Sequence, residues 1–173
     1  MERLPQTPPD EIWCDEFNFG WDDLIYPRAN YDDSLSVPPP SPKDAENKIA
    51  ALLPLFPENG LAFLFKQTFE PKAGFAAAMA QKFKAGAEKL RNGEYESGAK
   101  ELRGLGYGLT PAGDDFLCGY LSALYLRKES EEIRKAIYLT AKGNNLIANH
   151  FLTAAFKCSF FARFKAFAQS FCI

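Results

Sequence analysis

The chain has 173 residues, of which 47% are hydrophobic, and a formal net charge of −2. This length is typical of a single domain that can bury a core of its own. Because no block of lysine or arginine occurs, the sequence gives no reason to expect nucleic acid or an anionic membrane as a partner. No apolar run approaches the ~20 residues that a membrane-spanning helix needs.

Cysteine and histidine usage disfavours a metal site. The four cysteines lie far apart, and His150 is the only histidine, whereas zinc sites gather these residues at short spacing. We expect the thiols to be reduced and, because residues 1–5 start no apolar leader, the protein to be cytoplasmic. Cys118 has no histidine nearby in sequence, which argues against a nucleophilic role.

The first 40 residues form a proline-rich and aromatic-rich arm. Eight of the twelve prolines precede residue 43, and proline prevents long helices there. Trp13 and Phe17 bring too much apolar surface for a free tail. We therefore predict that residues 1–33 are irregular chain packed on the body, with room for a short strand. Residues 37–40 are predicted to be a stiff, polyproline-like linker.

Residues 41–173 are predicted to form a helical domain. Ser41-Pro42-Lys43-Asp44 is a helix start, and apolar residues then recur at helical spacing. The short apolar run 60–65 is bounded by turn residues and is predicted to be a strand. The fold class is thus mainly α, that is, α+β with a minor β element. The predicted helices span residues 41–53, 72–90, 94–102, 111–127, 130–142, 145–156 and 159–171.

A glycine loop separates the third and fourth predicted helices. Gly104, Gly106 and Gly108 alternate with larger residues, Thr110-Pro111 opens the helix with Thr110 as N-cap, and two acids follow. Acids in a first turn are stabilised by the helix dipole without any function. A bare-backbone loop at a helix N-terminus is also a ready anion site. The residues alone therefore leave two interpretations open, a capped helix start or a ligand loop of unknown type.

A second polar group surrounds the sixth predicted helix. Asn144 or Asn145 is predicted to cap that helix, and Asn149 and His150 could share one face of it with Thr153. A lone histidine on such a helix is more often a partly buried, hydrogen-bonded residue than a catalyst. Asn145 and His150 nevertheless remain candidates for substrate binding.

The run from Gly104 to Gly119, GLGYGLTPAGDDFLCG, resembles the signature of a bacterial family. That family is loosely labelled as carboxylases and was long a domain of unknown function; it includes the AllH-type subunit of oxamate carbamoyltransferase. The resemblance covers roughly residues 100–157. Tyr107 stands where the family usually has proline, and Ala112 where it often has serine. A second family motif, Gly-x-Thr-Ser-Gly-x-Asp, does not occur here, so the chain resembles a short or truncated member.

The resemblance implies carbamoyl transfer involving carbamoyl phosphate in purine or allantoin nitrogen metabolism, together with partner subunits. The loop amides would hold phosphate or a developing oxyanion, and a carboxylate would orient an amide or bind a divalent ion. No cofactor is certain, and magnesium is the one candidate. The alternatives are a non-catalytic metabolite-binding or assembly subunit, or a degenerate member without activity. The expected catalytic residues are Asp114 and Asp115, and the expected binders of a small anionic or amide metabolite are Gly106, Gly108, Thr110, Gly113, Asn145 and His150.

The C-terminal segment suggests association. Its phenylalanines exceed what one face of a final helix buries alone, and exposed apolar patches usually mark interfaces. We expect a second copy or a partner subunit to cover them, unless the N-terminal arm does so through Trp13, Phe17 and Trp21. The phenylalanines are Phe160, Phe161, Phe164, Phe167 and Phe171.

Overall fold

The structure is a computed structural model of residues 1–173. It describes residues 11–14, 17–20, 38, 40–56, 61–65, 74–160 and 162–172, with backbone only for the first two ranges and for residues 162 and 172. The chain divides into two compact units, Met1–Asn30 and Tyr31–Ile173. The predicted boundary near residue 40 stays a prediction.

The first unit contains one β-hairpin. Strand β1 (Glu11–Cys14) pairs antiparallel with β2 (Phe17–Gly20), with Glu11 opposite Gly20 and Cys14 opposite Phe17. The sequence left room for one short strand in this region. The predicted packing of the arm on the body, including its Trp13, Phe17 and Trp21 side chains, falls outside the described residues.

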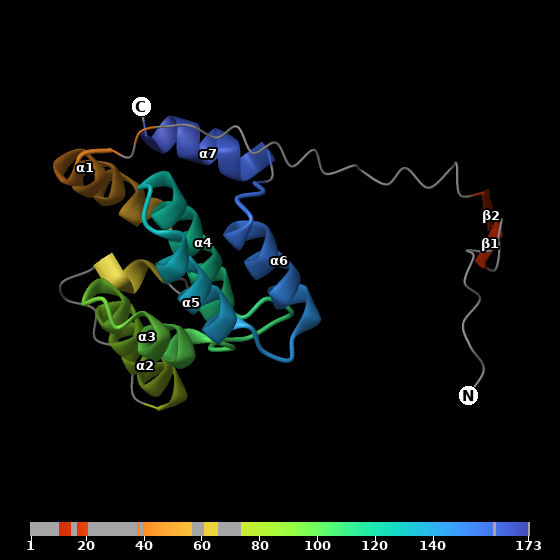
Figure 1. Ribbon diagram of the computed structural model, residues 1–173, viewed down its shortest axis with the longest axis horizontal. Helices are drawn as coiled ribbons and strands as arrows, with labels where there is room; N and C mark the ends of the chain where they lie inside the picture. Colours follow the sequence, from red (N-terminus) through yellow and green to blue (C-terminus); the bar gives the residue numbers. More distant parts are fainter. Residues whose placement is uncertain are drawn as a thin grey trace. The chain divides into compact units, whose positions relative to one another are not determined.

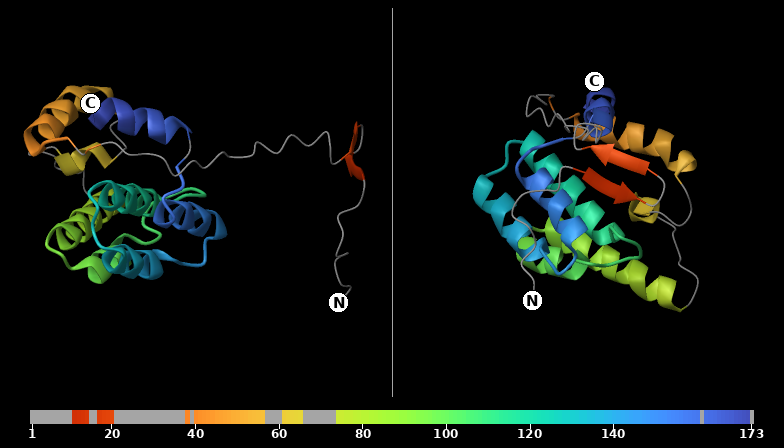
Figure 2. Two further views of the ribbon diagram at one scale, coloured as in Figure 1. Left: turned by 45° about the horizontal axis from the view of Figure 1, so that its top comes forward. Right: turned by 90° about the vertical axis from the view of Figure 1, so that its right-hand side faces the viewer.

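The second unit is all-helical over its described residues, so the mainly α prediction is confirmed for this unit (Figure 1). Helix α2 packs on α3, α3 on α5, and α4 on both α5 and α6 (Figure 2). The helices are α1 (Pro42–Leu52), α2 (Phe75–Arg91), α3 (Tyr95–Leu102), α4 (Ala112–Leu126), α5 (Glu131–Ala141), α6 (Leu146–Phe156) and α7 (Ala162–Cys172), with 3₁₀ turns η1 (Leu53–Leu55) and η2 (Leu61–Phe65).

Three of these helices start at side-chain caps that the sequence predicts. The Ser41 hydroxyl accepts the Asp44 amide at 3.2 Å, and the Ser130 hydroxyl accepts the Ile133 amide at 3.3 Å. Asn145 caps α6. Each cap satisfies an amide that the first turn of a helix leaves without an internal acceptor.

The strand predicted over residues 60–65 is wrong, because Leu61–Phe65 is the 3₁₀ turn η2. Phe63 is buried and meets Phe83 of α2 edge-on, with ring centroids 6.3 Å apart. Leu61 and Leu64, three residues apart, pack partly against the same core. A short apolar run buried on helices needs no sheet partner, and its composition does not distinguish the two structures.

The predicted start of α4 is also wrong in detail. Pro111, not Thr110, is the N-cap residue, and no side chain caps this helix. The Pro111 backbone is extended (φ −54°, ψ 140°), and its carbonyl accepts the Asp114 amide at 2.9 Å and the Asp115 amide at 3.1 Å. Proline therefore ends the loop, and the helix begins one residue later than the sequence suggested.

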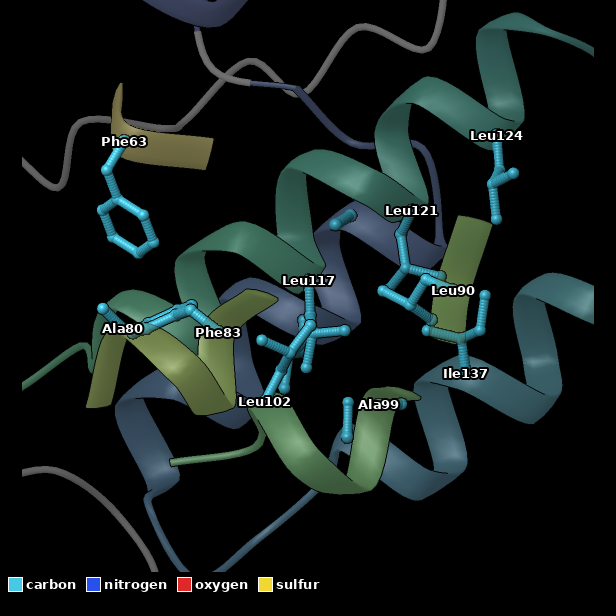
Figure 3. Close-up of a cluster of buried hydrophobic side chains, with 13 residues drawn as sticks. Phe63, Ala80, Phe83, Leu90, Ala99, Leu102, Leu117, Leu121, Leu124 and Ile137 are labelled. Atoms are coloured by element: carbon cyan, nitrogen blue, oxygen red, sulfur yellow. The ribbon is translucent and has the colours of Figure 1, made fainter. Parts of the chain in front are cut away.

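One core joins helices α2 to α6. Its largest fully buried side chains come from five different helices, as Figure 3 shows for most of them. Helices α2 and α3 interlock, because a Cβ on Gly86 would lie 2.6 Å from Leu102 Cγ and one on Gly98 would lie 2.7 Å from Leu90 Cγ. These fully buried residues are Leu90, Leu102, Leu117, Leu121, Ile137 and Leu152.

The C-terminal phenylalanines have different environments. Phe160 is 3% exposed in a small cluster with Cys158 and Ala168, whereas Phe167 is 53% exposed. Lys48 of α1 donates from Nζ to the Phe171 carbonyl at 2.7 Å. Phe161 lies outside the described residues. The structure therefore buries part of this segment within the chain, and association through the remainder stays a prediction.

Candidate functional site

The glycine loop connects α3 to α4 and lies beside the segment that precedes α6 (Figure 1). Backbone contacts hold its two ends together. The Leu105 amide donates to the Leu102 carbonyl at 3.0 Å, and the Gly113 amide donates to the Leu105 carbonyl at 2.7 Å. The Gly113 amide in the first turn of α4 is thus already hydrogen-bonded to a loop carbonyl. It is not available to a ligand, although the sequence alone suggested that it could be.

Two glycines in this region are required by contact. A Cβ on Gly113 would overlap the Leu102 carbonyl oxygen, so α4 can start this close to the end of α3 only without a side chain there. At Gly106, where φ is +123°, a Cβ would lie 2.7 Å from the Ala112 nitrogen. Gly104 and Gly108 also have positive φ values, 68° and 93°. The loop conformation itself therefore explains part of the glycine content.

The middle of the loop is open. Within the described part of the chain, the amides of Gly106 and Gly108 make no hydrogen bond to other protein groups. Gly108 is exposed and Gly106 half-buried, and a Cβ on Gly108 would meet only open space. These two amides are the donors that a bound anion or oxyanion could use.

The two adjacent acids differ in burial and in partners. Asp114 is 4% exposed, and its Oδ1 accepts the Gly104 amide at 2.8 Å. Burial raises the pKa of Asp114, while the Gly104 hydrogen bond and nearby Arg103 oppose that rise. Asp115 is exposed. Partial desolvation of its carboxyl raises the pKa of Asp115, and a hydrogen bond with the Thr110 side chain opposes the rise.

Cys118 lies one turn further along α4. Burial raises the pKa of the Cys118 thiol to about 12, and the charges of Asp115 and Asp114 add to the rise. A neutral thiol is a poor nucleophile, which agrees with the expectation that Cys118 does no covalent chemistry.

Asn145 connects the loop to α6. Its Oδ1 accepts the amides of Ile147 at 3.0 Å and Ala148 at 3.1 Å, and its Nδ2 donates to the Leu109 carbonyl at 2.6 Å. The sequence predicted the cap and named Asn145 a candidate binder, and the structure brings it to the loop. His150 is exposed, and its ring lies beside Phe151, with centroids 6.0 Å apart.

Arg103 is a contributor that the sequence reasoning missed. Its Nη1 donates to the carbonyls of Thr140 and Lys142, both at 3.3 Å, so it joins the start of the loop to the C-terminal end of α5. Cations commonly bind the last carbonyls of a helix. The signal in the sequence was a basic residue directly after a predicted helix end, but its partner helix could not be inferred.

A cavity of about 370 Å³ lies among η2, α2 and α4. None of the predicted site residues lines it, so it gives no support to the loop site. Its walls carry both apolar and charged groups: Leu64, Phe65, Lys84, Ala87, Glu88, Arg91 and Phe116.

Two further kinds of feature, a metal site and a membrane span, are absent from the described ranges. There, no group of three or more His, Cys, Asp or Glu side chains is placed to hold a metal ion. Among the helices of the same ranges, none combines the length and apolar character needed to cross a bilayer.

The fold and the site together define a helical domain with a glycine loop held against the first turn of a helix. Residues 102–172 match the family model described as oxamate carbamoyltransferase subunit AllH. This match begins at the last residue of α3 and includes the loop and α4 to α7. The resemblance expected from the loop sequence is thus confirmed over this segment. No curated protein and no solved structure matches the chain.

Proposed function

We propose that the chain is a subunit of a carbamoyl-transferring enzyme of the oxamate carbamoyltransferase type, and that its glycine loop binds a small anionic or amide metabolite. The observation that carries the proposal is the match of residues 102–172 to the AllH family model, since that segment contains the whole loop. The matched family is that of an enzyme subunit, so we expect catalysis to need partner subunits.

The loop geometry supports an anion or oxyanion position. The amides of Gly106 and Gly108 have no partner in the described chain, and they precede the positive end of α4. In carbamoyl transfer, a carbamoyl group leaves phosphate and joins an amide or carboxylate acceptor. We assign the loop amides, with Thr110, to the phosphate or the developing negative charge.

The acids next to the loop would bind the hydrogen-bond donors of the substrate, whereas the loop amides would bind its negative charge. A carboxylate accepts hydrogen bonds from an amide NH₂ group, so Asp114 or Asp115 would orient the carbamoyl nitrogen. Gly113 lets α4 approach the loop, and Asn145 bonds to the Leu109 carbonyl of the loop. We assign Asn145 and His150 to substrate binding as well.

Titration calorimetry with carbamoyl phosphate, inorganic phosphate and oxamate, each with and without magnesium, tests this proposal. We expect at least one of these compounds to bind, and Asp115→Asn to weaken oxamate binding by about tenfold or more, which is at least about 1.4 kcal/mol. Glu131→Gln is the matched control, because Glu131 is an exposed acid in the first turn of α5. Failure of all three compounds to bind would refute the loop site.

A non-catalytic assembly subunit is the second candidate function. Leu109 of the loop and Leu146 of α6 are 75% and 83% exposed, and the Asn145 contact brings these two segments together. Exposed apolar residues beside the loop favour a surface that another chain covers. Co-expression with partner subunits that restores no carbamoyl transfer, yet yields a stable complex, would favour this alternative.

A further inference from the structure

Asp114 and Asp115 are adjacent in sequence but occupy different positions in the fold. Successive residues of a helix point about 100° apart, and here one carboxylate turns inward while the other stays at the surface. Asp114 is 4% exposed, and Ser122 is the other buried polar residue among those described. The two acids therefore differ in what they can offer a soluble metabolite, because the buried carboxylate has little accessible surface.

The buried carboxylate joins the two ends of the loop. Asp114 Oδ1 accepts the Gly104 amide across ten residues of chain at 2.8 Å. The neighbouring Gly113 amide bonds to the Leu105 carbonyl at 2.7 Å. Two consecutive residues of α4 therefore hold two consecutive residues of the loop, one through a side chain and one through the backbone. These contacts do not include the Gly106–Leu109 segment, which is held at Leu109 by Asn145.

Among the groups near Asp114, the cation Arg103 supports the same arrangement. The titratable or charged groups that interact with Asp114 electrostatically are Arg103, Asp115 and Cys118. Arg103 is itself bonded to the carbonyls of Thr140 and Lys142. Arg103 thus links the start of the loop to the end of α5, and its positive charge also attracts the Asp114 carboxylate. All of these contacts act within the protein.

We infer that Asp114 is a positioning residue, which fixes the glycine loop through the Gly104 amide, and that Asp115 is the carboxylate that faces the ligand. The assignment of Asp115 rests on the proposed function, whereas the assignment of Asp114 does not. Asp115 is exposed beside Thr110 at the end of the open loop segment. The buried position of Asp114 keeps its acceptor oxygen in place, so the hydrogen bond from the Gly104 amide fixes the start of the loop.

Amide hydrogen exchange, read residue by residue by NMR, tests the positioning role. Asp114→Ala removes the acceptor, so we expect the Gly104 amide to exchange about tenfold faster or more. Asp114→Asn keeps an oxygen in the same place, so exchange at Gly104 should stay within about threefold of the parent. Asp115→Asn is the matched control and should leave Gly104 exchange unchanged. Rescue by asparagine separates loss of the acceptor from loss of charge.

Oxamate calorimetry on the same variants tests the division of roles. Asp114→Asn should retain oxamate affinity within about threefold, while Asp115→Asn loses about tenfold or more. Loss of binding in Asp114→Asn with a protected Gly104 amide would place Asp114 against the ligand and overturn the inference. Equal exchange at Gly104 in the parent and in Asp114→Ala would overturn it as well. If the parent binds no oxamate, the proposed function fails there, while the exchange data still decide the role of Asp114.

Discussion

Helices α4 and α6 begin side by side but are started by different means. Helix α6 has a side-chain cap, since Asn145 accepts two amides of its first turn. Helix α4 has none, and the amides of its first turn donate to the Pro111 and Leu105 carbonyls. This arrangement also requires that residue 113 has no side chain. The α6 start is therefore a local feature, whereas the α4 start depends on the end of α3 and on the whole loop.

This difference bears on where a ligand could bind. A self-capped helix keeps its start when the neighbouring chain moves. A helix start made from loop carbonyls is coupled to the loop, so any displacement of the loop also disturbs the first turn. The acids Asp114 and Asp115 lie in that coupled turn. Substitutions in the two starts should therefore differ in size and in how far their effects extend.

The largest effect is expected from Gly113→Ala. The new methyl group would overlap the Leu102 carbonyl oxygen, and relieving such a backbone overlap requires α3 and α4 to separate. We expect a loss of about 3 kcal/mol in the free energy of unfolding. Urea denaturation followed by circular dichroism measures it.

Gly119→Ala is the matched control for that substitution. Gly119 lies in the same helix and is exposed, and a Cβ there would meet nothing within 4 Å. The control should gain up to about 1 kcal/mol from helix propensity. Equal stability of the two variants would show that the α4 start is no more constrained than the middle of the helix.

A smaller effect is expected from Asn145→Ala. The substitution removes the cap of α6 and the 2.6 Å bond to the Leu109 carbonyl, so we expect a loss of about 1–2 kcal/mol in the free energy of unfolding. Asn144→Ala is the control and should change stability little, since Asn144 is exposed. If amide exchange rises in the loop as well as in α6, the two starts are coupled; a rise confined to α6 would confirm that its start is local.

The smallest effect is a pH dependence that arises at Asp114. Because burial raises the pKa of Asp114 in the folded chain above its ordinary value of 3.8, the folded state holds this proton more tightly than the unfolded state does. Its contribution to stability is then complete below pH 3.8 and is lost as the pH rises through the folded pKa. Thermal unfolding midpoints measured over a pH series should show this decline with rising pH in the parent, and Asp114→Asn should remove it.

Glu132→Gln provides a control of opposite sign for the pH series. Its own backbone and Ser130 hydrogen bonds lower the pKa of Glu132, so that carboxyl contributes stability that is lost as the pH falls. A pH profile of Asp114→Asn that coincides with the parent profile would contradict a perturbed Asp114.

The same contrast explains what could be predicted from the sequence. Ser41, Ser130 and Asn145 cap their helices through residues two or three positions away, and such local chemistry can be recognised from sequence. Thr110 looked equally good as a cap, but the extended Pro111 moved the helix start. The strand prediction for Leu61–Phe65 was wrong for a related reason, because the conformation of this segment depends on its packing against α2.

The candidate site was predictable only in part. Residue types in the sequence indicate the loop, its glycines and the acidic pair, and they also predict Asn145 as a candidate binding residue. The different burial of Asp114 and Asp115, and the link from Arg103 to α5, depend on how α3, α4 and α5 pack. Nothing in the local sequence specifies that packing.

The interlocked hairpin of α2 and α3 has a consequence for protein engineering. The Leu102 side chain packs against Gly86, and the Leu102 carbonyl oxygen lies where a side chain on residue 113 would be. The position of the loop thus depends in part on α2 and α3, which contribute none of its residues. Transplanting residues 104–115 into another scaffold should not reproduce the loop conformation, because the graft would leave behind the surface that shapes it.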